Sequence, residues 1–320
     1  MRLVTFAPGD TDGTDGTDGT DGADRLGALI TDDSVLDLTA AAADDPRLRS
    51  MPALIASGED GLKIARDLLD RTEFVRPLDT VQLRAPIPRP VKSVYCVGLN
   101  FRSHVEQNAT ALGLAPDIPD VPLFFSKPVT SVIGPDQPIR HDSRLTATLD
   151  YEIELAIVIG KGGTWIPREQ AAEHIFGYTV VNDVSARELQ WRTSQFLYGK
   201  GQDSYCPVGP AITTADAMPA LDDVVLRLLV NDDVRQEEPA GNMIFDPETV
   251  VAELSRGITL EPGDIISLGT PGGCAYQMVP TRYLVPGDTV VMEVTGIGRM
   301  TNPVVEVAPA RHRAASPAHP

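Results

Sequence analysis

Near the middle of the chain stands Asp150-Tyr151-Glu152-Ile153-Glu154-Leu155-Ala156-Ile157-Val158-Ile159-Gly160, in which two glutamates precede an apolar, β-branched run. The run and the glycines that follow it predict a buried strand. Side chains alternate across a strand, so Glu152 and Glu154 share one face while Ile153 and Leu155 take the other. Two carboxylates at the end of a core strand are costly to desolvate unless a cation lies between them. The pattern therefore favours a metal site, although the same spacing also occurs on strands whose carboxylates face solvent.

A second apolar segment supplies a third carboxylate. Tyr178-Thr179-Val180-Val181 ends in Asn182-Asp183, and Asp183 lies 29 residues after Glu154 with a helix-like segment at 167–176 between them. This connection is long enough to bring Asp183 back beside the two glutamates. Three carboxylates without a nearby cysteine suit Mg²⁺, Mn²⁺ or Ca²⁺ better than Zn²⁺. Three protein ligands also leave coordination positions open for water or substrate.

The composition excludes several classes of protein. The 320 residues are 42% hydrophobic and 22% charged, as in ordinary globular proteins, and the net charge is −18. Because no cluster of lysine and arginine forms a basic stripe, we expect no nucleic-acid partner. The chain has no apolar run of about 18 residues and no signal-like N-terminus, so we expect a cytoplasmic protein without a membrane partner. The three cysteines are far apart, and we expect small buried side chains at Cys96, Cys206 and Cys274.

Low-complexity and proline-rich stretches divide the chain. Strand-like runs and a helical region at 41–72 predict a small N-terminal α/β domain over residues 1–84. Within it, the Asp-Gly repeat at 10–22 has no apolar residue to bury, which predicts a disordered loop. Three prolines at 84–90 mark a boundary, and residues 91–307 are mostly strand-like, with one helix at about 246–255. We therefore expect an α+β protein that is predominantly β, ending in a flexible tail at 308–320.

Several collinear segments resemble the fumarylacetoacetate hydrolase family, in its acylpyruvate hydrolase-like branch. They span about residues 93–303 and are Val97-Gly98-Leu99-Asn100-Phe101 with His104, Phe125-Ser126-Lys127-Pro128, Ile133-Gly134-Pro135, 150–155, 177–187, Gly199-Lys200, Pro207-Val208-Gly209-Pro210, 260–264 and Leu268-Gly269-Thr270-Pro271-Gly272-Gly273. The resemblance implies a main domain built as a mixed β-sandwich roll, a divalent metal and a homodimer. It also implies hydrolysis or decarboxylation of a 1,3-dicarbonyl or 2-oxo acid.

The same resemblance gives roles to individual residues. Glu152, Glu154 and Asp183 match the metal carboxylates of the family. Lys200 matches its active-site lysine, which can stabilise the enolate formed when a C–C bond breaks. His104 matches a histidine on a lid segment that activates water, a task suited to a side chain that titrates near neutrality.

Four further side chains are candidate substrate contacts. Thr270 matches a threonine that contacts substrate after the last core strand. Arg187 and Gln190 follow the strand end at Asp183 and could instead lie on a helix surface. Lys127 could equally be a solvated loop lysine.

One departure from the family pattern bears on the reaction. The lid of the family pairs its histidine with a glutamate three residues later, where this chain has Gln107. Glu106 is the nearest carboxylate and serves as a catalytic candidate only if the lid is not helical, since it faces elsewhere on a helix. A glutamine can orient an imidazole but cannot stabilise an imidazolium as a carboxylate does.

Three functional hypotheses follow from these residues. The first is a divalent-metal-dependent hydrolase of an acylpyruvate-type 1,3-diketo acid, in which His104 activates water and Lys200 stabilises the leaving enolate. The second, prompted by Gln107, is a 2-oxo acid decarboxylase, tautomerase or lyase on the same metal site. The third is a non-catalytic metal-binding scaffold, which the complete set of carboxylates disfavours.

Overall fold

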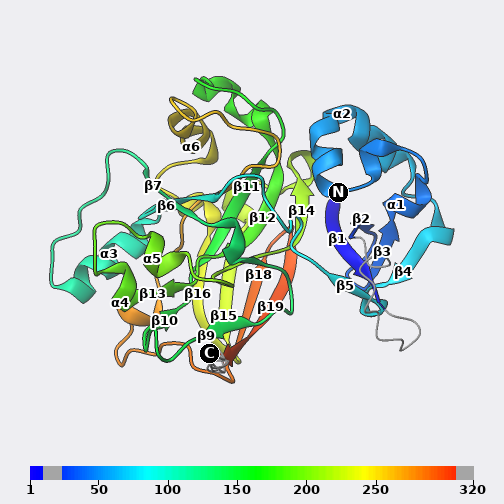
Figure 1. Ribbon diagram of the computed structural model, residues 1–320. Helices are drawn as coiled ribbons and strands as arrows, with labels where there is room; N and C mark the ends of the chain where they lie inside the picture. The colour runs from blue at the N-terminus through cyan, green and yellow to red at the C-terminus, as the bar shows by residue number, and fades with distance from the viewer. Residues whose placement is uncertain (10–23, 308–320) are drawn as a thin grey trace, which may run out of the picture.

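The computed structural model describes residues 1–9 and 24–307, and β-strands are their most abundant regular structure (Figure 1). The largest sheet has 12 strands. Its main path runs in the order β4 (Val75–Pro77), β3 (Ser34–Asp37), β2 (Arg25–Leu29), β1 (Arg2–Pro8), β14 (Cys206–Thr214), β12 (Ile175–Asn182), β11 (Ile153–Ile159), β17 (Ile265–Ser267), β6 (Val94–Gly98) and β7 (Leu123–Lys127). Two short strands lie off this path, β5 (Val81–Leu83) beside β1 and β8 (Val132–Ile133) beside β14.

A five-stranded sheet packs against the main part of the large sheet. Its order is β16 (Asp233–Pro239), β15 (Val225–Val230), β18 (Thr289–Val294), β19 (Gly298–Glu306) and β9 (Ile139–His141). A separate pair joins β10 (Leu149–Asp150) to β13 (Ser185–Ala186). The apolar faces of the two larger sheets meet in one hydrophobic core, which confirms the expected α+β, predominantly β fold.

The helices are few, and most are short. They are α1 (Leu38–Ala41), α2 (Met51–Asp67), α3 (Arg102–Leu112), α4 (Arg187–Gln190), α5 (Leu197–Lys200) and α6 (Pro247–Leu254). Helix α6 agrees with the expected helix at 246–255, and Asp246 caps its N-terminus with a carboxylate that accepts the Thr249 N–H at 2.8 Å. The expected helix at 167–176 is instead a 3₁₀ segment, Arg168–His174, that leads directly into β12. None of the described helices combines the length and apolar character needed to cross a membrane.

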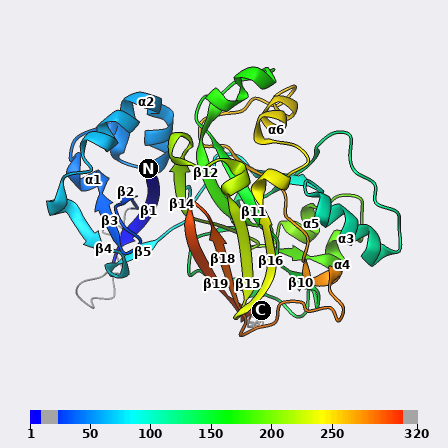
Figure 2. The same cartoon turned by 180° about the vertical axis from the view of Figure 1, so that it is seen from behind.

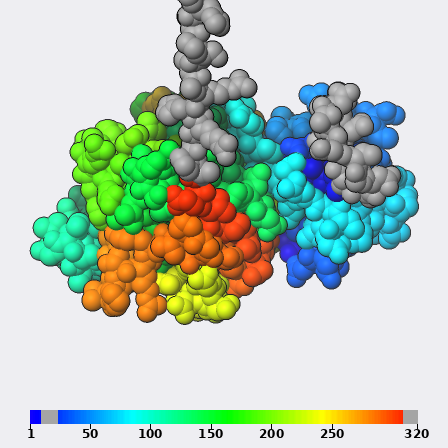
Figure 3. All heavy atoms as spheres, turned by 60° about the horizontal axis from the view of Figure 1, so that its bottom comes forward, coloured from blue at the N-terminus to red at the C-terminus, as the bar shows by residue number. Residues whose placement is uncertain are grey.

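The N-terminal strands and α2 form a lobe beside the main body (Figures 1 and 2). The lobe is continuous with the large sheet, because β1 pairs with β14 through Arg2↔Thr213 and Leu3↔Ile212. The surface view shows the lobe and the main body side by side (Figure 3). The predicted Asp-Gly loop at 10–22 and the predicted tail at 308–320 lie outside the described residues.

Strand β11 is buried on both faces, and this places the candidate metal ligands. Ile153 and Leu155 point into the core shared with the five-stranded sheet. Ala156 and Val158 point into a second core, to which α2 contributes. By alternation Glu154 lies on the side of Ala156, at the end of the strand where the second core stops. All seven residues of β11 are buried, so Glu154 is desolvated as the sequence predicted.

Candidate active site and metal centre

Three carboxylates meet where β11 and β12 run side by side. The two strands are antiparallel, and Ile153 pairs with Asn182, so Asp183 lies next to Glu152. The Asp183 N–H donates to the Glu152 carbonyl at 2.9 Å. One oxygen from each of Glu152, Glu154 and Asp183 lies within 4.8 Å of the other two, and all three side chains are buried. The structure thus brings together the three candidate metal ligands.

Two lysines contact Asp183 from different sides. Lys200 Nζ donates to Glu152 Oε2 at 2.9 Å and to one Asp183 carboxylate oxygen. Lys127 Nζ donates to the other Asp183 oxygen and to the Val184 carbonyl at 3.2 Å. Lys127 is fully buried and is not among the residues that line the cavity, so it anchors Asp183 in this structure. The side chain of Lys127 therefore does not reach the cavity in which we predicted that it contacts substrate.

The Lys200 ammonium remains charged in this setting. Burial by itself lowers its pKa, but the carboxylates of Asp183 and Glu152 raise the pKa above the ordinary value for lysine. The ammonium also lies 5.1 Å from the centre of the Phe125 ring, which adds a cation–π contact. Lys200 therefore acts at the site as a fixed positive charge and not as a base.

Arg187 is a second buried cation at the site. Its Nε donates to Asp150 Oδ2 at 2.8 Å, and its Nη1 donates to Gln190 Oε1 at 2.9 Å. Its Nη2 lies 2.7 Å from Glu152 Oε1, but outside hydrogen-bonding geometry, so this nitrogen has no hydrogen-bond partner among the described residues. The guanidinium also stacks over the Tyr276 ring at 4.4 Å. The Arg187 guanidinium is thus held between Asp150 and Glu152 and adds a buried positive charge to the cavity wall.

The two glutamates have opposite protonation tendencies. Burial raises the pKa of Glu154, and the neighbouring charges of Asp183 and Glu152 raise it further, well above the ordinary value. Its Oε2 accepts hydrogen bonds from the Ser267 hydroxyl and, at 3.1 Å, from the Gly269 N–H. Burial also opposes ionisation of Glu152, but the charges of Lys200 and Arg187 outweigh it and lower the pKa of Glu152. Without a bound cation, Glu154 holds a proton while Glu152 is ionised.

The charges at the site fit a divalent cation. The buried charged groups are Asp150, Glu152, Glu154 and Asp183 on the acidic side and Lys127, Arg187 and Lys200 on the basic side. With Glu154 protonated, these groups balance. A divalent cation that displaced that proton would leave the site with one positive charge, which attracts an anionic substrate. The oxygen donors of Glu152, Glu154 and Asp183 are those that Mg²⁺ and Mn²⁺ prefer.

A cavity of about 150 Å³ opens beside these carboxylates. Most of the polar candidates from the sequence line it, and Phe125, Trp191, Phe196 and Tyr276 provide apolar walls. The candidates on its wall are His104, Glu152, Glu154, Asp183, Arg187, Gln190, Lys200 and Thr270. The Thr270 hydroxyl follows β17 and accepts a hydrogen bond from Gln236 Nε2 at 2.8 Å, which fixes its orientation.

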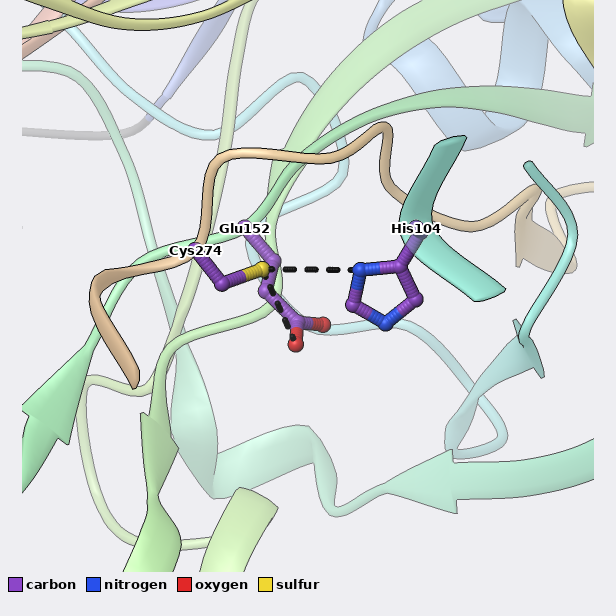
Figure 4. A group of neighbouring side chains, drawn as sticks. All are labelled: His104, Glu152 and Cys274. Carbon is purple, nitrogen blue, oxygen red and sulfur yellow. Dashed lines mark hydrogen bonds between the residues drawn. The ribbon is translucent and has the colours of Figure 1, made fainter. Parts of the chain in front are cut away.

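His104 reaches the cavity from α3, where it is buried (Figure 4). Its Nδ1 lies 3.2 Å from Gln277 Nε2 and 3.7 Å from Cys274 Sγ. Burial lowers the pKa of His104 to about 4. The charge of Glu152 raises this pKa, whereas the charges of Arg187 and Lys200 lower it further. The imidazole is therefore neutral at physiological pH.

Cys274, Glu152 and His104 form a compact group (Figure 4). Cys274 Sγ lies 3.9 Å from Glu152 Oε1, and burial raises the pKa of the thiol well above its ordinary value. The protonated thiol is a poor metal ligand, and Arg187 Nη2 already lies 2.7 Å from Glu152 Oε1. We therefore interpret this group as a hydrogen-bonded cluster, in agreement with the small buried cysteine that the sequence predicted.

The structure does not bring Glu106 to the cavity. Residues 102–112 form a regular helix, so a side chain two positions after His104 faces another direction, and Glu106 is exposed. Gln107 also turns away from the imidazole, and its Oε1 accepts the Gly273 N–H at 2.8 Å. The glutamine whose side chain contacts the His104 ring is therefore Gln277 and not Gln107.

Four site residues were not identified from the sequence, namely Asp150, Cys274, Tyr276 and Gln277. Asp150 opens the glutamate-rich stretch, and its charge next to the candidate ligands was an available signal. The other three follow the Gly272-Gly273 turn about 170 positions after His104, and no local pattern links them to that histidine.

Known proteins are similar to this chain over most of its length. A family model described as "Fumarylacetoacetate (FAA) hydrolase C-terminal" matches residues 93–305. The oxaloacetate tautomerase YisK of Bacillus subtilis (strain 168) is 37% identical over 291 residues, which are 87% of this chain and 95% of that protein. The mitochondrial oxaloacetate tautomerase fahd2 of Xenopus laevis is 36% identical over 310 residues, which are 95% of this chain and 90% of that protein.

Solved structures show the same architecture. The fumarylacetoacetate hydrolase EaFAH from psychrophilic Exiguobacterium antarcticum has a TM-score of 0.77 at 35% identity, covering 95% of this chain and 100% of that one. Maleylpyruvate hydrolase from Sphingobium sp. SYK-6, in complex with manganese(II) ion and pyruvate, has a TM-score of 0.73 at 30% identity, covering 96% and 100%. Since the family model matches more than half of the chain, the protein belongs to the fumarylacetoacetate hydrolase family.

Proposed function

We propose that this protein catalyses a metal-dependent keto–enol tautomerisation of a 2-oxo dicarboxylic acid of the oxaloacetate type. One observation carries the choice of reaction. The Nδ1 of His104 contacts Gln277 and Cys274, and no carboxylate is hydrogen-bonded to the ring among the described residues. A histidine without such a carboxylate is poorly equipped to take a proton from water. Tautomerisation consumes no water and moves one proton from oxygen to carbon.

The relatives support the same choice. Two of the similar proteins named above are oxaloacetate tautomerases, and each matches more than four fifths of this chain. The Gln107 departure, which suggested a reaction without hydrolytic water, agrees with them. The proposal thus adopts the second of the three hypotheses drawn from the sequence.

The side chains of the cavity suit an enolate of a dicarboxylic acid. When bound by Glu152, Glu154 and Asp183, a divalent metal supplies a Lewis acid for the substrate oxygens. The fixed charge of Lys200 lies beside these ligands and stabilises negative charge on the enolate. The positive charge of Arg187 on the cavity wall attracts a substrate carboxylate, and the hydroxyl of Thr270 orients the bound acid from the same wall.

Hydrolysis of an acylpyruvate-type acid is the second candidate. It is favoured by the complete set of metal carboxylates and by the similarity to maleylpyruvate hydrolase, whose structure holds manganese(II) and pyruvate. In this reaction His104 would have to accept a proton from water.

Product analysis separates the candidates. The purified protein with Mg²⁺ or Mn²⁺ is mixed with the enol form of oxaloacetate, and the enol absorbance, pyruvate and CO₂ are followed together. Tautomerisation lowers the absorbance without releasing pyruvate or CO₂, whereas decarboxylation releases both. A parallel reaction with acetylpyruvate yields pyruvate and acetate if the protein is a hydrolase. Loss of enol absorbance no faster than in a metal-only blank would refute the proposal.

A further inference from the structure

The orientation of the Gln277 side-chain amide is fixed by the backbone around it. Its Oε1 accepts the N–H of Gly273 at 3.0 Å and the N–H of Cys274 at 3.1 Å. Because two N–H donors require an oxygen at that position, the NH₂ end of the amide must face His104. Gln277 Nε2 lies 3.2 Å from His104 Nδ1 and 3.3 Å from the His104 carbonyl oxygen.

The fixed amide determines which nitrogen of the imidazole carries the proton. An NH₂ group can only donate, so His104 Nδ1 must accept. The second group near Nδ1 is the Cys274 thiol at 3.7 Å, whose single S–H can donate to Nδ1 or to Glu152 Oε1 at 3.9 Å, so the amide of Gln277 decides the tautomer. In a neutral imidazole that accepts at Nδ1, the ring proton is on Nε2. His104 lines the cavity, and no described residue forms a hydrogen bond to its Nε2.

We propose that Gln277 is a positioning residue that holds neutral His104 as the Nε2–H tautomer, so that the ring presents a hydrogen-bond donor to the substrate oxygen. The inference rests on the proposed function and specifies how the histidine takes part in it. A neutral imidazole N–H can stabilise the oxygen of an enolate, and the same N–H cannot accept a proton from water. Gln277 thereby favours tautomerisation over hydrolysis.

Gln277→Glu tests directly whether Gln277 fixes the tautomer of His104. A glutamate has nearly the same shape and can still accept the N–H groups of Gly273 and Cys274. Its second oxygen replaces a donor with an acceptor facing Nδ1, so the neutral ring must carry its proton on Nδ1 and leave Nε2 unprotonated.

Gln107→Glu provides a matched control. Gln107 is also a glutamine whose Oε1 accepts the Gly273 N–H, at 2.8 Å, but no described hydrogen bond joins its side chain to His104. The same chemical change at this position should leave the tautomer of His104 as it is in the wild type.

The direct measurement is ¹⁵N NMR of protein labelled at histidine, with His104 assigned by comparison with His104→Asn. In the wild type we expect Nε2 to appear as the protonated nitrogen and Nδ1 as the unprotonated one. At mildly alkaline pH, Gln277→Glu should exchange the two assignments, and Gln107→Glu should not. In parallel, kcat for tautomerisation should fall about 10²-fold in Gln277→Glu with little change in KM, as expected for loss of one donor to the reacting oxygen.

The tautomer of His104 and the reaction that the protein catalyses can be tested independently. A wild-type ring protonated on Nδ1 would overturn the inference whatever reaction the protein catalyses. Equal kcat in Gln277→Glu and the wild type, with the tautomer exchanged, would overturn the role of the Nε2–H donor. If the wild type carries its proton on Nε2 but has no tautomerase activity, the proposed function falls and the role of Gln277 in fixing the tautomer is supported.

Discussion

At the scale of single residues, the three candidate metal ligands are held by different partners. Asp183 accepts from two lysines, and Glu152 pairs with Lys200 and Arg187, whose charges lower the pKa of Glu152. Among the described residues, Glu154 accepts side-chain hydrogen bonds from the Ser267 hydroxyl and the Gly269 N–H, and no cation is paired with it. Of the three ligands, Glu154 is therefore the one whose protonation depends on whether a cation is bound.

The first prediction concerns the proton on Glu154. Its pKa is raised above the ordinary value, so the metal-free site is protonated there, and metal binding should release about one proton. Because a proton must leave, metal affinity should rise with pH and fall as the solution becomes acidic. Titration calorimetry in buffers of different ionisation enthalpy measures the proton count. Glu154→Gln should bind Mn²⁺ at least tenfold more weakly, on the order of 1.4 kcal/mol, and should release no proton.

The second prediction concerns the pH dependence of His104. Its pKa is lowered to about 4 by burial, so the imidazole stays neutral as the pH falls through the range in which an ordinary histidine gains a proton. The kcat for tautomerisation should therefore show no acid limb near pH 6.5, the ordinary value for histidine. Any loss of kcat due to protonation of His104 should begin only as the pH approaches 4. A pH–rate profile with a limb near pH 6.5 that disappears in His104→Asn would contradict this prediction.

The sequence predicted the candidate metal ligands better than it predicted the residues that contact His104. Alternation along one strand and the cost of burying charge pointed to Glu152 and Glu154, and the segment ending at Asp183 and the family resemblance strengthened that interpretation. Gln277 contacts His104 across 173 positions of chain, and such a pairing depends on how distant loops pack. Glu106 was a candidate only for a lid that is not helical, and residues 102–112 form a helix, so its side chain faces away from the imidazole.

At the scale of elements, the loop after β17 connects the metal site to the cavity wall. Gly269 has a φ of +89° and donates its N–H to Glu154. A Cβ at this position would lie 2.7 Å from the Asn100 Cβ and 2.9 Å from the Val97 carbonyl oxygen. The loop therefore needs a glycine both for its backbone conformation and for its close contact with the segment before α3.

The third prediction is that Gly269→Ala damages both stability and activity. Strain at positive φ costs about 1–3 kcal/mol, and the clash with Asn100 should add to it and displace the Glu154 contact. Gly287→Ala is the matched control, since Gly287 has a φ of +98° and nothing lies within 4 Å of its Cβ position. Urea unfolding and activity should show a larger loss of both for Gly269→Ala. Equal losses in the two variants would mean that the close contact has no effect.

The strands were more predictable than the connections between them. The buried run of β11 follows from its apolar, β-branched residues, and β12 follows from the same pattern. The segment Arg168–His174 was expected to be an α-helix but forms 3₁₀ turns. It is only seven residues long, and a segment of this length takes its geometry from the strands that it connects.

At the scale of the whole molecule, the fourth prediction is that the protein is a homodimer, as the family resemblance implies. Exposed apolar side chains on one segment support this, since Trp191, Leu197 and Tyr198 are each about half exposed. Light scattering coupled to size exclusion should give twice the chain mass of 34.3 kDa. A mass of one chain at all concentrations tested would contradict the prediction.

The fifth prediction is that metal binding stabilises the entire fold. The candidate ligands lie at the ends of β11 and β12 in the middle of the large sheet, and unfolding separates them. A ligand that binds only the folded state at about 100 times its Kd stabilises it by about 2.7 kcal/mol. For a chain of 320 residues this corresponds to a rise in Tm of about 4 °C. Mn²⁺ should produce this rise in the wild type and EDTA should reverse it, whereas the rise in Glu154→Gln at the same Mn²⁺ concentration should be about half as large or smaller. An equal rise in Glu154→Gln would mean that Mn²⁺ acts elsewhere on this acidic protein, because nonspecific binding to its surface carboxylates does not require Glu154.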